Sequence, residues 1–299
     1  MSSTRKALLA SAFTMLPLCA SPLIHADGTP ALYVQHCAQC HGADRLGLMG
    51  PALLPENLTR VRKTEAARVI AEGRPATQMP ALGAVLDKAA IERLVEYIYT
   101  PLPTVPAWDV EQIEASRKAT VATADLVEAP VHDADPMNMF IVVELGDHHA
   151  SVLDGDRMVP IHRFKTQYAV HGGPKYSPDG RFVYFLSRDG WVSKFDMWGL
   201  QTVVEVRAGI NARNLAVSDD GRYLMVANYL PHSLVLLDAL ELRPLKLIDV
   251  QDDAGKSSRV SAVYTADPRH SFVAALKDIP EVWEINYEDN PPRGFGEWM

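Results

Sequence analysis

The stretch YVQHCAQCHGADRLGLMGPAL, residues 33 to 53, places Cys37 and Cys40 three positions apart, and His41 follows the second cysteine directly. A Cys-x-x-Cys pair occurs in redox disulfides, in zinc sites and at sites of c-type haem attachment. The residue after the pair separates these three kinds of site, and a histidine there indicates haem attachment. The spacing alone makes this a specific signal.

The two other kinds of site need features that the surrounding sequence does not supply. A zinc site needs four ligands, and the chain holds no second cysteine pair, because its third cysteine, Cys19, stands alone near the N-terminus. A thioredoxin-like pair follows a strand, whereas TPALYVQH in front of this pair has the pattern of a helix with Pro30 in its first turn. Both alternatives are therefore disfavoured.

In a c-type haem site, Cys37 and Cys40 form thioethers with the porphyrin and His41 supplies the proximal nitrogen to iron. The motif GLMGPAL then places the carbonyl of Pro51 where it can accept from the His41 ring, a contact that fixes the orientation of the ring. Residues 33 to 53 thus predict one covalently bound haem c, with Cys37 and Cys40 as its attachment points and His41 as an iron ligand.

Two later segments extend this prediction. ATQMPALG places Met79 beside a proline as the candidate distal iron ligand, and Met49, eight positions past the histidine, is a weaker candidate. DKAAIERLVEYIYTP begins with the capping residue Asp87, repeats apolar residues at helical spacing and stops before Pro101. Residues 27–103 therefore resemble a class I cytochrome c. Ligation by histidine and methionine leaves no open position, so this haem is expected to relay single electrons.

The N-terminus and the net charge restrict location and partners. Residues 1–26 combine two basic residues, an apolar run and small residues before Asp27, the pattern of a secretory signal peptide. A membrane anchor is the alternative, but the apolar run is short and is interrupted by prolines. We expect export to a periplasm with no membrane span after cleavage. The net charge of -8 argues against nucleic-acid binding and favours protein and small-molecule partners.

Beyond a proline-containing and acidic linker, residues 104–136, a pattern of strand, polar turn and strand recurs. Its copies are FIVVELGDHHASVLD, VYFLSRDGWVSKFD, LMVANYLPHSLVLLD and FVAALKDIPEVWEIN, which end at Asp154, Asp196, Asp238 and Asn286, at spacings of 42, 42 and 48 residues. A period of about 40 to 45 residues with short strands and Asp-Gly turns indicates propeller blades. Residues 137–299 supply about four blades, so the sequence predicts a multidomain chain: an all-α cytochrome c domain followed by a partial all-β propeller.

The segments QYAVHGGPKYSPDGRFVYFLSRDGWVSKFDMWGL, ELGDHHASVLDGD, AGINARNLAVS and ANYLPHSL, behind a cytochrome domain, resemble the haem d1-binding propeller family. This family includes cytochrome cd1 nitrite reductases and related proteins of haem d1 biogenesis. The resemblance covers most of residues 27–299 and about the first half of the family's eight-bladed propeller. The sequence is most similar to the biogenesis type with a cytochrome domain, a dihydro-haem d1 dehydrogenase.

The resemblance implies a non-covalent haem d1 with His171 as its proximal iron ligand, and the two glycines after this residue allow a planar ring to approach. The alternative is a turn histidine without a ligand. Haem d1 carries several carboxylates, so Arg188 and Arg213 are expected at its rim, with Arg207 as a weaker candidate. Each could instead be a solvated surface arginine. The family's distal histidines have no counterpart before Met299.

Catalytic residues are harder to assign. His148 and His149 point to opposite faces if both lie in a strand, so that one could act as a base near the ring. Tyr229 could donate to a haem substituent, although a buried aromatic of a blade is an equal interpretation.

The resemblance implies that a propionate side chain of dihydro-haem d1 is oxidised to an acrylate and that haem c passes the electrons to a periplasmic electron-transfer protein. Other proteins of haem d1 biogenesis or nitrite reduction are further expected partners. Two alternatives stay open: a nitrite reductase, in which electrons flow from haem c to haem d1, and a non-catalytic cytochrome that transfers electrons or carries haem d1.

Overall fold

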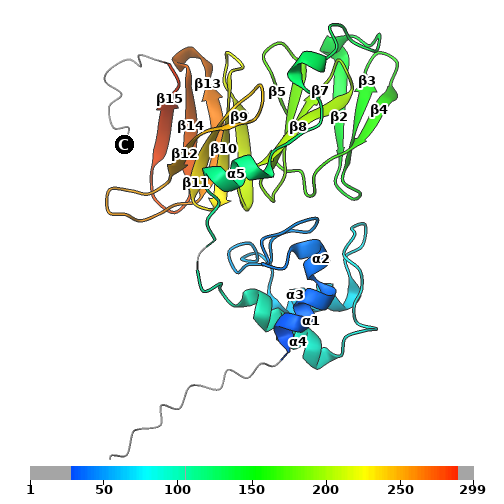
Figure 1. The fold of residues 1–299 in the computed structure, drawn as a ribbon, viewed down its shortest axis with the longest axis vertical. Helices are drawn as coiled ribbons and strands as arrows, with labels where there is room; N and C mark the ends of the chain where they lie inside the picture. The colour runs from blue at the N-terminus through cyan, green and yellow to red at the C-terminus, as the bar shows by residue number, and fades with distance from the viewer. Residues whose placement is uncertain (1–27, 105, 289–299) are drawn as a thin grey trace, which may run out of the picture.

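The computed structural model describes residues 28–104 and 106–288, with the first four α-helices gathered at one end of the molecule and the sheets at the other (Figure 1). The α-helices are α1 (Thr29–His36), α2 (Ala38–His41), α3 (Lys63–Glu72), α4 (Lys88–Tyr99) and α5 (Val110–Ser116), and the short 3-10 helices are η1 (Thr123–Asp125), η2 (Pro136–Asn138) and η3 (Asp267–Arg269). The predicted signal peptide lies outside the described residues. Among the residues described, every helix is too short or too polar to cross a lipid bilayer.

Helices α1, α3 and α4 form the core of the N-terminal domain. The Asp87 side chain caps α4 by accepting from the Ala90 N–H at 2.7 Å. The apolar residues of α4 then repeat at helical spacing and are all buried: Ile91, Leu94, Val95 and Ile98. Tyr33 of α1 is fully buried against this face, with its ring 5.3 Å from that of Tyr97. The predicted helix pair of a class I cytochrome c is confirmed.

The remaining chain forms four antiparallel sheets that stand side by side in sequence order (Figure 1). The first contains β2 (Met139–Glu144), β3 (His149–Asp154) and β4 (Val159–Lys165). The second contains β1 (Lys118–Ala119), β5 (Lys175–Tyr176), β6 (Phe182–Leu186), β7 (Trp191–Asp196) and β8 (Gln201–Arg207). The third contains β9 (Asn211–Val217), β10 (Tyr223–Leu230), β11 (Ser233–Asp238) and β12 (Pro244–Asp249). The fourth contains β13 (Val260–Ala266), β14 (Ser271–Leu276) and β15 (Val282–Asn286).

The acidic or amide residue that ends each repeat closes the turn that follows it. The Asp154 carboxylate accepts from the backbone N–H of Asp156 at 2.9 Å. In the same way, Asp196 accepts from Trp198 at 3.1 Å, and Asn286 accepts from Glu288 at 2.7 Å. These side chains accept from backbone N–H groups that are no longer paired within the sheet, which explains why each sequence repeat ends in Asp or Asn.

In two repeats the first strand, β6 or β10, is preceded by the same turn. In SPDG, the Ser177 hydroxyl accepts from the Phe182 N–H at 2.9 Å, and Gly180 adopts a φ of 73°. In SDDG, Ser218 accepts from the Tyr223 N–H at 2.9 Å and Gly221 has a φ of 72°. Glycine adopts this left-handed conformation without steric strain, so the Asp-Gly signal correctly predicted both turns.

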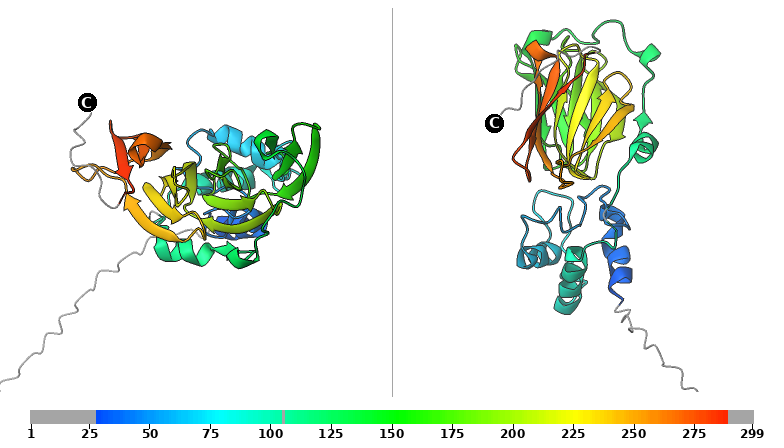
Figure 2. Two further views of the ribbon diagram at one scale, coloured as in Figure 1. Left: turned by 90° about the horizontal axis from the view of Figure 1, so that it is seen from above. Right: turned by 90° about the vertical axis from the view of Figure 1, so that its left-hand side faces the viewer.

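The linker is an ordered part of the second domain rather than a free tether. Helix α5 lies across the sheets, in contact with β8 and β12, and its N-terminus has a capping box between Asp109 and Gln112. After it, β1 pairs antiparallel with β8 through Lys118 and Ala119. The turned views in Figure 2 show the helical domain beneath one end of the sheets, with this segment at their side.

The two domains share a small apolar core at their contact. Ala52 and Leu54 of the helical domain are buried with Ile210 and Leu230 of the third sheet and its entry loop, and Leu46, Leu102 and Trp108 pack around them. The haem-type motif and the ends of the blades therefore lie against each other. The order predicted from the sequence, a helical cytochrome c domain followed by propeller-type sheets, is confirmed.

Candidate functional site

The cysteine pair lies at the junction of α1 and α2, and both thiols are free. Burial, reinforced by the neighbouring Cys40, raises the pKa of Cys37 to about 11. A thiol of this kind is protonated at neutral pH, whereas the attacking cysteine of a redox pair needs a lowered pKa. The surroundings of Cys37 therefore do not favour the redox alternative.

His41 is buried with one ring nitrogen already engaged. Its Nδ1 lies 2.8 Å from the carbonyl oxygen of Pro51, and because a carbonyl can only accept, Nδ1 carries the proton. Burial lowers the pKa of His41, so the ring is neutral and Nε2 keeps a free lone pair. Gly50 packs on this ring so closely that a Cβ there would lie 2.7 Å from Cε1. The expected contact with Pro51 is present, and only glycine fits beside it.

Met79 packs against the same core as Cys37, whereas Met49 is half-buried in the turn beside Gly50. The backbone of Met79 is held on both sides: its N–H donates to the Thr77 hydroxyl at 3.2 Å, and its carbonyl accepts from Arg74 at 3.1 Å. Of the two candidate methionines, Met79 is the one that shares the apolar core with the cysteine pair.

In the sheet domain, His171 lies in the loop before β5, and backbone hydrogen bonds hold this loop against the β6–β7 turn. Its N–H donates to the Leu186 carbonyl at 2.7 Å, and the Arg188 N–H donates to the Ala169 carbonyl at 2.9 Å. The two following glycines adopt φ values of 86° and 72°. A cavity of about 260 Å³ opens here, lined by Val143, Leu145, Val170, His171, Gly172 and Gly173. The side chain of His171 therefore borders a space that a ligand can enter.

Burial and three nearby arginines together favour the neutral form of His171. Burial is the main cause that lowers the pKa of His171, and Arg188, Arg213 and Arg60 lower it further. In the described part of the chain, none of these three arginines forms an ion pair with a carboxylate. The buried Nε of Arg213 also has no hydrogen-bond partner. Arg188 and Arg213 are the rim candidates of the sequence analysis, and their contact with a ligand stays a prediction, whereas Arg60, from the helical domain, was not predicted.

Tyr229 on β10 extends the cationic surface. The guanidinium of Arg213 stacks on its ring at 4.2 Å, that of Arg259 lies at 5.3 Å, and the Lys277 ammonium lies at 6.0 Å. Asp278 neutralises Arg259 through two hydrogen bonds of 2.8 and 2.5 Å. The excess of positive charge over this face, contributed by both domains, is complementary to a ligand with several carboxylates.

His148 and His149 do not both lie in a strand, so the prediction that their side chains point to opposite faces of one strand does not apply. His148 is in the turn before β3 with a φ of 61°, and only His149 is in the strand. His148 Nδ1 accepts from the Ala169 N–H at 3.4 Å, two residues from His171, and its ring edge meets Tyr168. His149 turns instead toward Asp147, at 3.4 Å from its carboxylate. Of the two, His148 is nearer the cavity.

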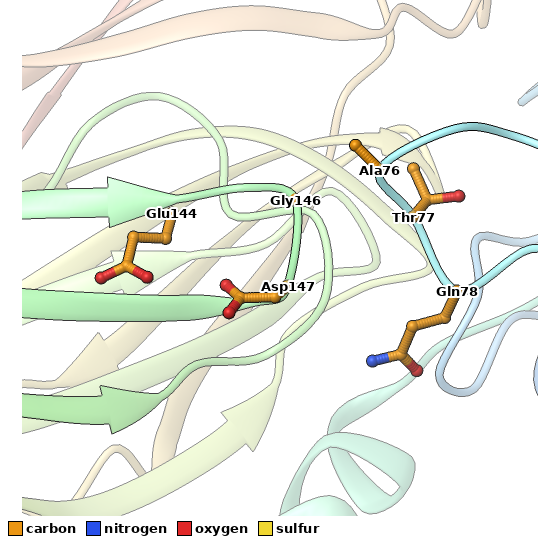
Figure 3. Close-up of a pocket in the computed structure, with 6 residues that line it drawn as sticks. All are labelled: Ala76, Thr77, Gln78, Glu144, Gly146 and Asp147. Carbon is orange, nitrogen blue, oxygen red and sulfur yellow. The ribbon is translucent and has the colours of Figure 1, made fainter.

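A second cavity, of about 520 Å³, lies between the domains (Figure 3). Ala76, Thr77 and Gln78 of the loop before Met79 line one side, and Glu144, Gly146 and Asp147 at the end of β2 line the other. The β2–β3 turn thus separates this cavity from the one beside His171. Glu144 and Asp147 are both paired with Arg163, which neutralises part of their charge.

Arg207, the weaker rim candidate, does not act on His171. It is buried at the domain contact, where Nη2 donates to the Leu46 carbonyl at 2.5 Å and Nε donates to the Asp189 carbonyl at 2.8 Å. The prediction of a rim position for Arg207 is therefore wrong for this structure, because its guanidinium is already occupied by the two carbonyls.

Asp189 is a buried carboxyl beside this contact, and its Oδ2 has no hydrogen-bond partner. Burial raises its pKa from 3.8 to about 7, although Arg207 and Arg188 oppose the shift. The folded chain therefore keeps a proton that the unfolded chain releases between these two pH values, so stability falls as the pH rises through this window.

We expect Asp189→Asn to unfold with the same free energy as the parent at about pH 4 and to be more stable at about pH 8. The gain is at most about 4 kcal/mol, because each pKa unit corresponds to about 1.4 kcal/mol. Urea unfolding at both pH values measures the difference. An equal effect of the substitution at both pH values would show that ionisation of Asp189 is not its cause.

Comparison with known proteins places the chain in a family. Residues 134–295 match the family described as "Cytochrome D1 heme domain", and residues 26–98 match "Cytochrome C oxidase, cbb3-type, subunit III". The "Dihydro-heme d1 dehydrogenase" of Pseudomonas aeruginosa is 57% identical over 262 residues, which cover 88% of this chain and 53% of that protein. The "Nitrite reductase" of Stutzerimonas stutzeri is 26% identical over 281 residues, or 88% of this chain and 49% of that protein.

A solved structure supports the same relationship. "Dihydro-heme d1 dehydrogenase NirN in complex with DHE" superposes with a TM-score of 0.83 at 56% identity, over 88% of this chain and 57% of that one. The chain spans about half the length of these relatives. Because the family match covers more than half of the residues and includes the sheets that carry His171, the chain belongs to the cytochrome d1 haem-domain family.

Proposed function

We propose that this chain belongs to a periplasmic c-type cytochrome of haem d1 biogenesis that oxidises dihydro-haem d1. The observation that carries the proposal is the convergence of Arg60, Arg188 and Arg213 on a neutral His171, next to a domain with a haem attachment motif. The similarity to the dihydro-haem d1 dehydrogenase supports the same substrate.

The residues of the helical domain fit a covalent haem c. Cys37 and Cys40 are free for thioether formation, and His41 presents Nε2 because Pro51 holds the opposite nitrogen. Met79, which shares the core with Cys37, is the proposed distal ligand. When bound, haem c supplies one-electron acceptance at a potential that methionine ligation raises.

The residues on the sheets fit a polyanionic macrocycle. The unpartnered Nε of Arg213 and the unpaired charges of Arg60 and Arg188 offer donors to rim carboxylates. His171 is neutral and borders a cavity edged by two glycines, so its ring can bind iron without first losing a proton. Tyr229 is already covered by cations, so we assign it a share in this positive surface rather than a catalytic role.

In the proposed reaction, a CH2–CH2 unit of a propionate side chain becomes the CH=CH unit of an acrylate, which releases two electrons and two protons. The arginines hold the side-chain carboxylates in place, and His171 fixes the ring. Burial lowers the pKa of His148, and its Nδ1 accepts from the Ala169 N–H, so its ring is a weak proton acceptor and we assign it no role in taking up the released protons. A periplasmic electron-transfer protein is the proposed final acceptor.

The test is turnover by the chain loaded with haem c. With dihydro-haem d1 as the sole reductant, we expect the haem c absorption to change to that of the ferrous form, with two haem c groups reduced, each by one electron, for every molecule of haem d1 formed. With reduced haem c and bound haem d1, nitrite is expected to give no nitric oxide. Nitric oxide formation would favour the nitrite reductase alternative, and binding of haem d1 without either reaction would favour a carrier.

A further inference from the structure

Arg207 is the point at which three separate segments of the chain meet. Its guanidinium donates to the Leu46 carbonyl of the helical domain and to the Asp189 carbonyl of the β6–β7 turn, and it lies 4.8 Å above the Trp108 ring of the linker. The linker also holds the backbone of Arg207. Trp108 Nε1 donates to the Arg207 carbonyl at 2.8 Å, and the Arg207 N–H donates to the Ser116 hydroxyl at 2.8 Å.

The first carbonyl belongs to the loop that carries the haem attachment motif. Leu46 lies five residues after His41, and the next residue, Gly47, donates its N–H to the His41 carbonyl at 3.0 Å. A Cβ at Gly47 would lie 2.9 Å from the Ala52 nitrogen, so this turn has no room for a side chain at that position. The position of the Leu46 carbonyl therefore follows the position of His41.

The second carbonyl belongs to the turn beside His171. Asp189 follows Arg188, whose N–H is bound to Ala169 and whose carbonyl accepts from Ala212 at 3.0 Å. A Cβ at the next residue, Gly190, would lie 2.0 Å from the Gly209 carbonyl, so this turn too is closely packed. A guanidinium that bonds both carbonyls thus connects the His41 loop to the His171 segment through a single side chain.

The connection requires arginine chemistry. Arg207 is 7% exposed, and burying its charge is favourable only because donors in a fixed planar fork meet two carbonyls at once. A lysine presents a single ammonium at the end of a flexible stem, and an apolar side chain leaves both carbonyls unsatisfied at a desolvated contact.

We propose that Arg207 is the positioning residue that fixes the spacing of the two cofactor loops, and so the path between the dihydro-haem d1 site and haem c. Arg207 touches neither site directly. Its role in electron passage rests on the proposed function, whereas its role in docking the two loops does not. The experiments below keep these two parts separate.

The docking role is tested on the chain loaded with haem c, without haem d1, by amide hydrogen exchange. In Arg207→Met, exchange is expected to rise by about tenfold or more in both residues 42–53 and residues 186–192, because the charge-assisted hydrogen bond across the contact to Leu46 and the one to Asp189 within the second sheet are both lost. Arg207→Lys is expected to show a smaller rise. Circular dichroism shows whether each variant is folded, and the lysine variant keeps the test valid if the methionine variant is not.

The matched control is Arg181→Met. Arg181 also fixes the linker to the second sheet, since it donates to the Val127 carbonyl at 2.8 Å and pairs with Asp196 at 3.2 Å. Within the described residues, its hydrogen bonds and ion pair all lie in the linker and the second sheet. This variant should raise exchange near Val127 and leave residues 42–53 unchanged. If the Arg207 variants leave residues 42–53 as protected as in the parent, the docking role is refuted.

The electron role is tested by rapid mixing with dihydro-haem d1. In Arg207→Met, reduction of haem c is expected to slow by about tenfold or more, in line with the loss of the docked arrangement, while the haem c potential and the affinity for haem d1 stay at parental values. Unchanged reduction in a variant with raised exchange would refute the role in electron passage alone. A parent that reduces no haem c would refute the proposed function, and the exchange result would still decide the docking role.

Discussion

A chain in which Cys37 and Cys40 are both replaced by serine is expected to carry no haem that survives denaturation. The hydroxyl of serine does not form the thioether by which each cysteine holds the porphyrin, so the double variant retains only the bond from His41. The single variants Cys37→Ser and Cys40→Ser each keep one thioether and are expected to retain haem at reduced yield. Haem-stained denaturing gels and pyridine haemochrome spectra measure the covalently attached fraction.

The two cysteines are half-buried at a helix junction, so serine fits in their place and a folding defect is not expected. Circular dichroism and the retained binding of ligands at the sheet domain check this point. If the unmodified chain, produced together with a haem attachment system, shows no covalent haem, the assignment of the motif is wrong.

His171→Ala is expected to weaken binding of haem d1 by more than about 100-fold, since loss of residues that merely support a metal ligand already costs about 10- to 100-fold. The haem c spectrum should not change, because the two sites lie in separate domains. Titration followed in the red absorption band of haem d1 measures the affinity.

Arg188→Ala is the control for this variant. Arg188 is exposed, and an exposed ion pair contributes at most about 1 kcal/mol, or about fivefold. The order of the two effects distinguishes an iron ligand from a rim contact. If His171→Ala binds as tightly as the parent with the same spectrum, His171 is a turn residue and the site lies elsewhere.

Most of the fold could be predicted from the sequence repeats, because each repeat is closed by hydrogen bonds between residues that are close together in the chain. The terminal Asp196 and its counterparts cap turns two to three residues ahead, and the Ser177 and Ser218 turns are closed within five residues. Hydrogen bonds of this short range can be predicted from the sequence. The predicted strand pairs coincide with β2–β3, β6–β7, β10–β11 and β14–β15.

The candidate site was only partly predictable, because some of its contacts join distant segments through groups that every residue possesses. Arg188 and Arg213 lie in recognisable segments, but Arg60 comes from the other domain and no pattern near it suggests its position. Arg207 was expected at a ligand rim, yet it bonds backbone carbonyls of Leu46 and Asp189. A carbonyl has no sequence signature, so only the structure reveals such a partner.

The pairing of β1 with β8 has a consequence for solubility. The outer strand of a sheet offers unpaired N–H and C=O groups to other chains, and proteins counter this with proline, lysine or a covering segment. The edge strands β4 and β12 carry Pro160 and Pro244 together with lysines, whereas β8, with the sequence QTVVEVR, has neither residue type and is largely buried. Strand β1 pairs with this edge, and the two residues after it, Thr120 and Val121, donate their N–H groups to the Val203 carbonyl. The segment between the domains therefore also guards this edge against intermolecular strand addition.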